Sequence, residues 1–272
     1  SNFTIYLFIF FVISAAQAQI DIVFDIDWTL VYPVDETMKN EARVYLVQGE
    51  YYRVSDGAEE VIASLFKDPR FRVSFFSGGD KLRNEELLKQ IILPLKDKTA
   101  LDVAYKVLSR EDLSVVSTDE NLGFSERFKK DLTIVNKNLN QVVLVDDLKN
   151  FTPSGQEDNL LWVGRTYTYQ DKFKKLPLSK YIPDSELSWL NERYKLFWVY
   201  SSIEEAASLS MKTGSSFKDV LNKVVEKKQP QRPSNKIIRE ALDVIVKLSN
   251  QYEGAKIKLP VSFINCEASF IK

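Results

Sequence analysis

The chain has 272 residues, with 37 lysines and arginines, 38 aspartates and glutamates, one cysteine and no histidine. The lack of histidine excludes a Ser-His-Asp triad, an imidazole base and a His-ligated zinc site. The single Cys266 excludes an intrachain disulfide and a four-cysteine metal site. A net charge of −1 gives no electrostatic reason to expect a nucleic-acid partner. The composition therefore favours chemistry by Asp, Glu, Lys, Ser and Thr, with hard metals held by oxygen ligands.

The chain begins with a short apolar segment. Residues 4–15 are mostly apolar, and no charged residue precedes Asp21. About a dozen apolar residues are too few for a membrane-spanning helix, which needs roughly 20. Ala16 and Ala18 follow in the A-x-A pattern of a signal-peptide cleavage site. We therefore expect a signal peptide at residues 1–18, a secreted or periplasmic protein, and no transmembrane helix in the mature chain. The alternative is a buried segment of the mature fold.

Apolar runs of strand length alternate with amphipathic segments through the first two thirds of the chain. Strands are predicted at 20–24, 71–76, 141–145 and 160–163. Helices are predicted after residue 57, and after residue 79 with an apolar stripe that extends to Leu95. This alternation indicates a doubly wound parallel α/β sheet. Residues 43–54 predict a β-hairpin that turns at Gly49 and could close over a site as a flap.

The last third of the chain has a helical pattern. Ser202-x-x-Glu205 and Ser216-x-x-Asp219 predict two helix starts. A further helix is predicted from the apolar stripe of Ile237, Ala241, Val244 and Leu248. We therefore expect an α/β core at 19–178, with the hairpin as an insertion, and a helical C-terminal extension at 179–272. The extension could pack on the core, shape the substrate site or bind a partner.

Polar residues gather at the predicted carboxyl ends of the strands, where open α/β sheets bind ligands. Each of these features by itself is weak evidence for a site, because paired acids also form turns and helix caps and a lone lysine is usually solvated. Their order and shared placement predict one site. The residues are Asp25, Asp27 and Thr29 after the first strand, Ser77, Gly78 and Gly79 after the second, Lys130 before the third, and Asp146 and Asp147 after it.

On these motifs the chain resembles the haloacid dehalogenase (HAD) superfamily. Within it, the chain is most similar to the NLI-interacting-factor-like and C-terminal-domain phosphatases. The resemblance covers about residues 19–175 and rests on the segments 24–30, 75–79, 130–132 and 143–147. Trp28 and the Ser77-Gly78-Gly79 run depart from residues that are common in that branch. We therefore do not carry over its polymerase-tail substrate.

The resemblance implies a Mg²⁺-dependent phosphomonoester hydrolase. It implies that Asp25 is a nucleophile that forms an aspartyl-phosphate, and that Asp27 is the general acid and base. Lys130 and Ser77 would neutralise and bind the phosphate. The further expected substrate contacts are Thr29, Gly78, Gly79 and Arg83, although Arg83 could instead belong to the start of the following helix. The expected metal ligands are Asp25, the carbonyl of Asp27, and Asp146 or Asp147, with Asp147 favoured as the direct ligand.

Other functions remain compatible with the same residues. The core could be a phosphate-binding or phosphoprotein-binding module that uses the helical extension as a protein-interaction surface. The same acids would also support phosphate transfer to another acceptor, or a nucleotidase. The expected substrate is a phosphorylated small molecule or a phosphopeptide. The sequence indicates neither its identity nor the oligomeric state.

Overall fold

A five-stranded parallel sheet lies at the centre of the computed structural model, which describes residues 19–174, 181–228 and 235–252. The strand order is β10-β9-β1-β5-β6. Its strands are β1 (Ile20–Phe24), β5 (Phe71–Phe76), β6 (Val107–Leu108), β9 (Val142–Asp146) and β10 (Leu160–Trp162). All the pairings between them are parallel. The predicted α/β class is confirmed, and β9 begins one residue later than expected.

A second, antiparallel sheet is inserted after β1. Its order is β2-β4-β3, with β2 at Val31–Val34, β3 at Val44–Val47 and β4 at Glu50–Val54. The β3–β4 hairpin turns at Gln48 and Gly49, which both have positive φ, as a tight hairpin turn requires. The predicted hairpin is confirmed. The sequence pattern missed β2, because a four-residue strand that contains Pro33 has little signal of its own.

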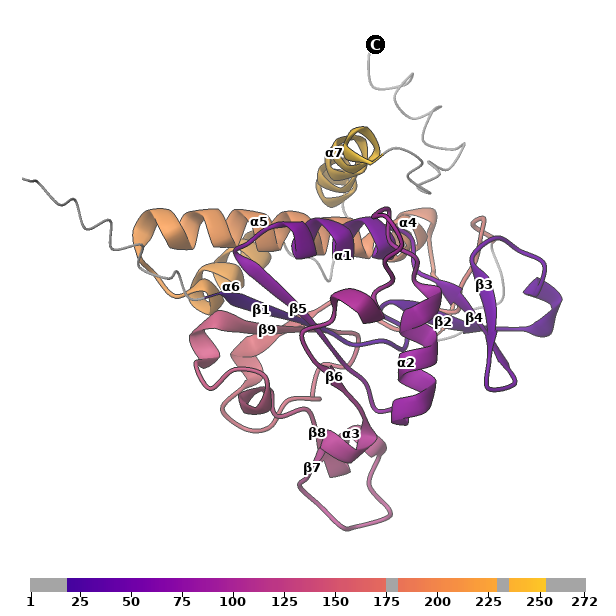
Figure 1. Ribbon diagram of the computed structural model, residues 1–272, viewed down its shortest axis with the longest axis horizontal. Helices are drawn as coiled ribbons and strands as arrows, with labels where there is room; N and C mark the ends of the chain where they lie inside the picture. The colour runs from indigo at the N-terminus through magenta and orange to yellow at the C-terminus, as the bar shows by residue number, and fades with distance from the viewer. Residues whose placement is uncertain (1–18, 175–180, 229–234, 253–272) are drawn as a thin grey trace, which may run out of the picture.

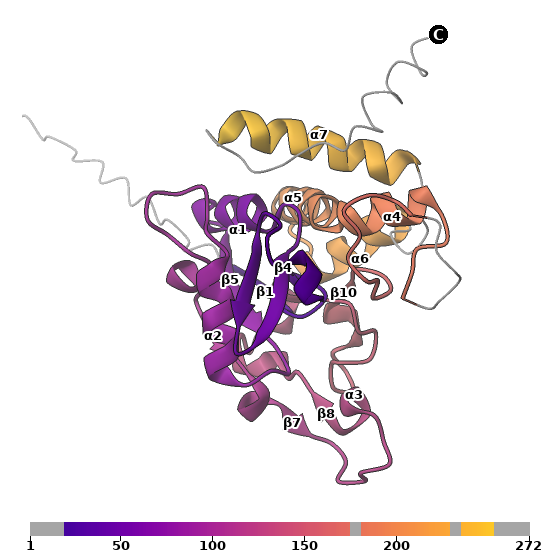
Figure 2. The ribbon, with the colours of Figure 1, turned by 90° about the vertical axis from the view of Figure 1, so that its right-hand side faces the viewer.

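Helices cover one face of the parallel sheet. The described helices are α1 (Ala58–Lys67), α2 (Lys81–Gln90), α3 (Phe124–Arg127), α4 (Glu186–Arg193), α5 (Lys195–Thr213), α6 (Phe217–Lys228) and α7 (Asn235–Gln251), of which the single-turn α3 lies instead beside β8. Helices α1 and α5 run side by side along this face (Figure 1). Helix α7 lies outside α5, on the side away from the sheet (Figure 2). In the part of the chain that the structure describes, no helix has the length and the apolar run needed to span a membrane.

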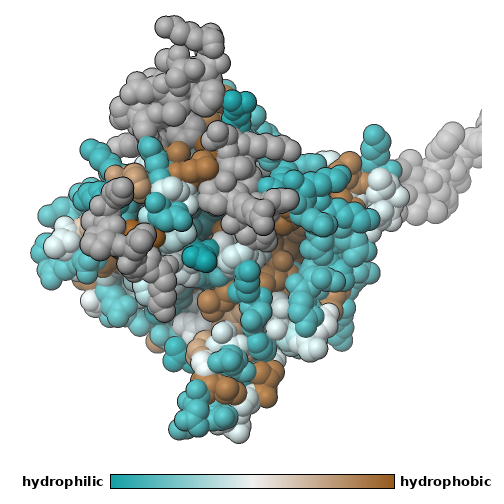
Figure 3. Space-filling view, turned by 180° about the vertical axis from the view of Figure 1, so that it is seen from behind, coloured by the Kyte–Doolittle hydropathy of each residue, from teal (hydrophilic) through white to brown (hydrophobic). Residues whose placement is uncertain are grey.

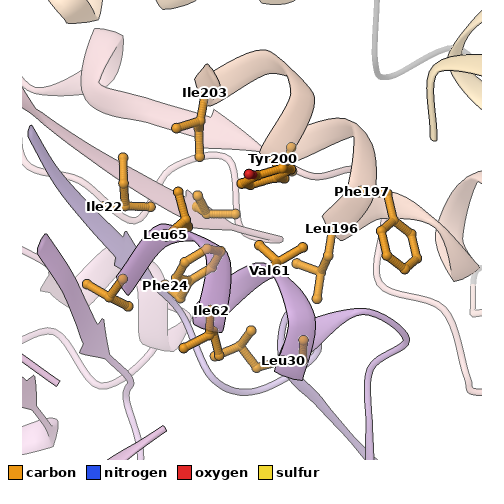
Figure 4. Close-up of a cluster of buried hydrophobic side chains, with 14 of the residues drawn as sticks. Ile22, Phe24, Leu30, Val61, Ile62, Leu65, Leu196, Phe197, Tyr200 and Ile203 are labelled. Atoms are coloured by element: carbon orange, nitrogen blue, oxygen red, sulfur yellow. The ribbon is translucent and has the colours of Figure 1, made fainter. Parts of the chain in front are cut away.

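The sheet separates two hydrophobic cores, because successive side chains of a strand point to opposite faces. Ile22 and Phe24 face the larger core, which α1 and α5 share (Figure 4). Val23 faces the smaller core, which contains Leu132 and Phe151. This second face is covered by single helical turns and by the short β7 (Ser114–Val115) and β8 (Phe128–Lys129). The C-terminal extension is therefore part of the main core.

Two boundaries differ from the expectation. Helix α2 ends at Gln90, and Ile92, which the stripe included, is 48% exposed. Ser202 does not start a helix but lies fully buried in the middle of α5, because the apolar run 196–200 is itself helical and buried. The start at Ser216 is confirmed, since its hydroxyl accepts a hydrogen bond from the Asp219 backbone at 3.2 Å. The predicted signal peptide lies outside the described residues, so export stays a prediction.

Candidate active site

The ends of β1 and β9 bring the acidic motifs together. Phe24 pairs with Val145, and the Asp25 backbone N–H donates to the Val145 carbonyl at 2.9 Å. Asp25 and Asp146 therefore leave neighbouring strands side by side. On the other side of β1, Phe24 pairs with Phe75 of β5, which places the Ser77 loop at the same edge. The parallel register therefore brings the motifs after β1, β5 and β9 together at one edge of the sheet, as predicted.

Lys130 joins the two acidic motifs. Its side chain is fully buried, and its ammonium donates to Asp25 Oδ1 and to Asp146 Oδ2, both at 2.6 Å. Its backbone N–H is held by the carbonyl of Phe151 at 2.8 Å, and the Phe151 ring lies 4.5 Å from the ammonium. Burial lowers the pKa of Lys130, but the carboxylates of Asp146 and Asp25 more than offset this and raise the pKa above its usual value. Lys130 therefore carries a fixed positive charge.

Asp146 and Asp147 have different surroundings. Both oxygens of Asp146 are engaged, one by Lys130 and the other by the Leu148 backbone N–H at 2.7 Å. Asp147 lines a cavity and accepts a hydrogen bond from the Thr166 hydroxyl. Burial and the charge of Asp146 raise the pKa of Asp147 to about 6. This arrangement favours Asp147 as a direct metal ligand and Asp146 as the residue that fixes Lys130.

Three buried carboxylates can offer oxygens to one ion. Ligand atoms of Asp25, Asp146 and Asp147 lie within 4.8 Å of one another. Burial and the neighbouring acids raise the pKa of Asp25 well above its usual value, and Lys130 only partly offsets this effect. Three carboxylates against one ammonium leave two negative charges unbalanced, which matches a divalent cation with oxygen ligands.

Asp27 is held by two neighbours. The Ser77 hydroxyl donates to Asp27 Oδ2 at 2.9 Å, and the guanidinium of Arg83 binds both carboxylate oxygens. Arg83 also contacts the flap, since its Nε donates to the Tyr52 hydroxyl at 3.2 Å. We expected Ser77 and Arg83 to bind substrate. The Ser77 side chain is fully buried and Arg83 pairs with Asp27, so both position Asp27. Arg83 also lines a cavity beside Asp27, so its contact with substrate stays a prediction.

The two glycines and Thr29 separate into different roles. Gly78 lines both cavities at the site, and Gly79 lines the smaller one. Gly79 also makes room for Arg83, because a Cβ at Gly79 would collide with the Arg83 guanidinium and lie 2.6 Å from Asn84 Oδ1. Thr29 is fully buried and lines neither of the cavities at the site, and its carbonyl accepts a hydrogen bond from the Ser55 hydroxyl at 2.8 Å. The structure therefore does not bring the Thr29 side chain to the expected substrate site.

The sequence pattern missed an anchor from the C-terminal extension. Lys195, at the start of α5, is fully buried and donates to the backbone carbonyl of Trp28, between Asp27 and Thr29. It also pairs with Glu192 at 2.7 Å, and Glu192 accepts from the Tyr32 hydroxyl at 2.5 Å. Trp28 has a φ of +61°, which is uncommon for a bulky residue, so this contact holds a strained turn. No motif distinguishes Lys195 from a solvated helix lysine.

Two cavities meet at the acidic cluster. The larger, of about 590 Å³, is lined by Asp25, Asp27 and Asp147 and by several aromatic side chains. The smaller, of about 320 Å³, is lined by Arg83 and Arg110. Both include Asp27, Gly78 and Phe124. Asp27, whose side chain is 28% exposed, can therefore contact a molecule in either cavity.

Sequence comparison assigns the family. A model of the NLI interacting factor-like phosphatases matches residues 20–186, which is more than half of the chain. The chain belongs to this family. It is therefore a phosphatase of the HAD superfamily that acts on phosphorylated substrates, as the motifs indicated. A comparison with curated proteins found no similar sequence.

Two solved structures are similar to this phosphatase. One is Fcp1, described as an essential RNA polymerase II CTD phosphatase, with 15% identity and a TM-score of 0.46 over 77% of this chain and 71% of that chain. The other is the fission yeast RNA polymerase II CTD phosphatase Fcp1 bound to beryllium fluoride, with 13% identity and a TM-score of 0.41. The second match covers 85% of this chain and 63% of that chain.

Proposed function

We propose that this phosphatase hydrolyses phosphomonoesters with Mg²⁺, through an aspartyl-phosphate on Asp25. The observation that carries the proposal is the buried Lys130, which bridges Asp25 and Asp146 at 2.6 Å each. A buried cation at this position offsets the repulsion between an attacking carboxylate and a phosphate. Asp25 lines the larger cavity, so its carboxylate is accessible to a phosphate there.

The donor set fits Mg²⁺. Asp25 and Asp147 both line the cavity, and their oxygens lie within 4.8 Å of each other. Mg²⁺ binds in proteins through one or two carboxylates, waters and substrate phosphate oxygens. When bound, the ion would neutralise charge on the phosphate during its transfer. The carbonyl of Asp27 remains a proposed third protein ligand.

In the proposed first step, an oxygen of Asp25 attacks phosphorus and the bond from phosphorus to the ester oxygen breaks. The leaving oxygen takes the electron pair of that bond and a proton from Asp27. In the second step, water attacks the phosphorus, Asp27 accepts a proton from the water, and Asp25 is released as a carboxylate. Ser77 and Arg83 keep the Asp27 carboxyl at the junction of the two cavities.

The proposal can be tested with the purified chain. Beryllium fluoride with Mg²⁺ is expected to raise the melting temperature, and each alone should raise it less. Hydrolysis of p-nitrophenyl phosphate should require the metal and stop with EDTA. A metal-dependent thermal shift without any turnover would contradict hydrolysis and favour the binding module.

The binding-module alternative has less support from the structure. That alternative uses the helical extension as a surface for a partner. The extension instead buries Leu196, Phe197 and Trp198 in the main core, and Lys195 binds the Trp28 carbonyl, next to Asp27. These contacts support a role for α5 within the enzyme.

Mg²⁺ affinity is expected to increase with pH. Because the pKa of Asp147 is raised to about 6, this group keeps its proton to a higher pH than an ordinary aspartate, and the proton competes with the metal. The dissociation constant for Mg²⁺, measured by isothermal titration calorimetry, should fall at least about tenfold from pH 5 to pH 7. Asp147→Asn should bind Mg²⁺ much more weakly at both pH values. A dissociation constant that does not change over this range would contradict the role of Asp147.

Gly79→Ala is expected to displace Arg83 from Asp27, because the new Cβ would occupy the space of the guanidinium. With Asp27 less well oriented, kcat for p-nitrophenyl phosphate should fall about tenfold or more. Arg83→Met should give a similar loss, and the double variant should lose no more than either single variant. Losses that multiply in the double variant would show that Gly79 and Arg83 act independently.

A further inference from the structure

The larger cavity beside the acidic cluster has an apolar wall. Its lining is mostly apolar surface, contributed by Trp28, Phe124, Leu148, Phe151 and Tyr181. A volume of about 590 Å³ is more than a phosphate group fills, so the cavity has room for part of the alcohol. Aromatic side chains around such a space bind planar apolar groups by stacking and by burial of apolar surface.

The charged groups of this cavity all have the same sign. Asp25, Asp27 and Asp147 line it, and none of the described residues in its lining is a lysine or an arginine. Lys130 is fully buried, with its ammonium bound by Asp25 and Asp146. A leaving group with a negative charge of its own would face these carboxylates in the larger cavity, because the guanidiniums of Arg83 and Arg110 line the smaller cavity and not this one.

Phe124 is a fixed part of the wall. Its ring packs on Phe128 at 4.9 Å between centroids and meets Phe151 edge-on at 5.9 Å. It also lies against Gly78, where an added Cβ would come within 2.8 Å of the ring. The ring is 42% exposed, on the lobe formed by β7, α3 and β8, whose apolar residues appear at the bottom of Figure 3. Phe124 therefore lies beside the Ser77–Gly79 loop, where its ring contacts Phe128, Phe151 and Gly78 and the Arg110 guanidinium lies 5.8 Å from the ring centroid.

We infer that this site takes phosphomonoesters whose alcohol carries an uncharged aromatic group close to the ester oxygen. The aromatic group lies in the larger cavity against Phe124 and Trp28, while the phosphate lies at Asp25. Sugar phosphates and nucleotides are disfavoured, because their hydroxyls or extra charges would face an apolar and negatively charged lining. This inference rests on the proposed function and adds the class of substrate to it.

The test compares ethyl phosphate, 2-phenylethyl phosphate and 2-(4-carboxyphenyl)ethyl phosphate with the Mg²⁺-loaded full chain. All three release a primary alkanol of similar reactivity, so differences in kcat/KM report contacts with the aromatic group. The phenyl compound should exceed ethyl phosphate at least about tenfold. The added carboxylate should remove most of this gain.

Phe124→Ala should lower the ratio of phenylethyl to ethyl phosphate at least about fivefold. Phe66→Ala is the matched control, because Phe66 of α1 is exposed to the same degree, 41%, and lines neither cavity at the site; its ratio should not change. Equal kcat/KM values for ethyl and phenylethyl phosphate, or a carboxylate compound as good as the phenyl compound, would overturn the inference alone. Failure to hydrolyse any of the three, with p-nitrophenyl phosphate still hydrolysed, would overturn the inference alone, whereas failure to hydrolyse p-nitrophenyl phosphate as well would overturn the proposed function.

Discussion

Asp25→Asn should lower Mg²⁺-dependent hydrolysis of p-nitrophenyl phosphate at least about a thousandfold. An amide oxygen cannot replace the carboxylate as nucleophile, and losses of this size are typical when a nucleophile is removed. The substitution keeps the size of the side chain. Rates of the purified variant and of the parent chain, both with saturating Mg²⁺, provide the measurement. Residual activity above a tenth of the parent value would show that Asp25 is not the nucleophile.

The same variant should not be less stable than the parent protein. Because burial and the neighbouring acids raise the pKa of Asp25 well above its usual value, ionised Asp25 destabilises the metal-free fold at neutral pH. A neutral amide removes this cost, so the melting temperature without Mg²⁺ should stay the same or rise. Asp102→Asn, at an exposed acid on a turn away from the site, is the control and should keep full activity. If the variant were inactive and also unfolded, its loss of activity would be explained by instability and not by loss of the nucleophile.

Lys195→Met is expected to destabilise the protein by about 3 to 5 kcal/mol, the usual cost of removing one partner from a buried ion pair. Glu192 would stay buried without its cation, and the Trp28 carbonyl would lose its donor. Urea unfolding measures the loss. Lys247→Met is the matched control in the same extension. The Lys247 side chain is 52% exposed where it pairs with Glu204, so little stability and no activity should be lost.

A second substitution separates stability from positioning. Glu192→Gln together with Lys195→Met removes the unpaired charge but keeps an acceptor for the Tyr32 hydroxyl, so most of the stability should return. The Trp28 carbonyl would still lack its anchor. We therefore expect kcat in the double variant to remain about tenfold below the parent value, with the KM for p-nitrophenyl phosphate little changed. Full recovery of kcat would show that Lys195 has a structural role alone.

The sequence by itself predicted the parts of this protein that depend on local pattern. Apolar runs gave the main strands, because a buried strand must be apolar on both faces. The acids after β1 and β9, with Lys130, could be placed at one edge, because parallel strands end together. The family then followed from short motifs whose spacing the active-site chemistry requires, and the comparison with the family model confirmed it.

The tertiary structure decided how those residues are used. Arg83 and Ser77 bind Asp27, and Lys130 binds Asp146. Side chains from separate segments compete for the same partners once they are buried together. Lys195 could not be predicted, since a lysine becomes an anchor only when a distant carbonyl meets it inside the core. The aromatic wall of the larger cavity could not be predicted either, because it depends on which rings the fold brings beside Gly78. Local pattern therefore determined the fold and the acidic cluster, whereas packing between distant segments decided which groups face the substrate.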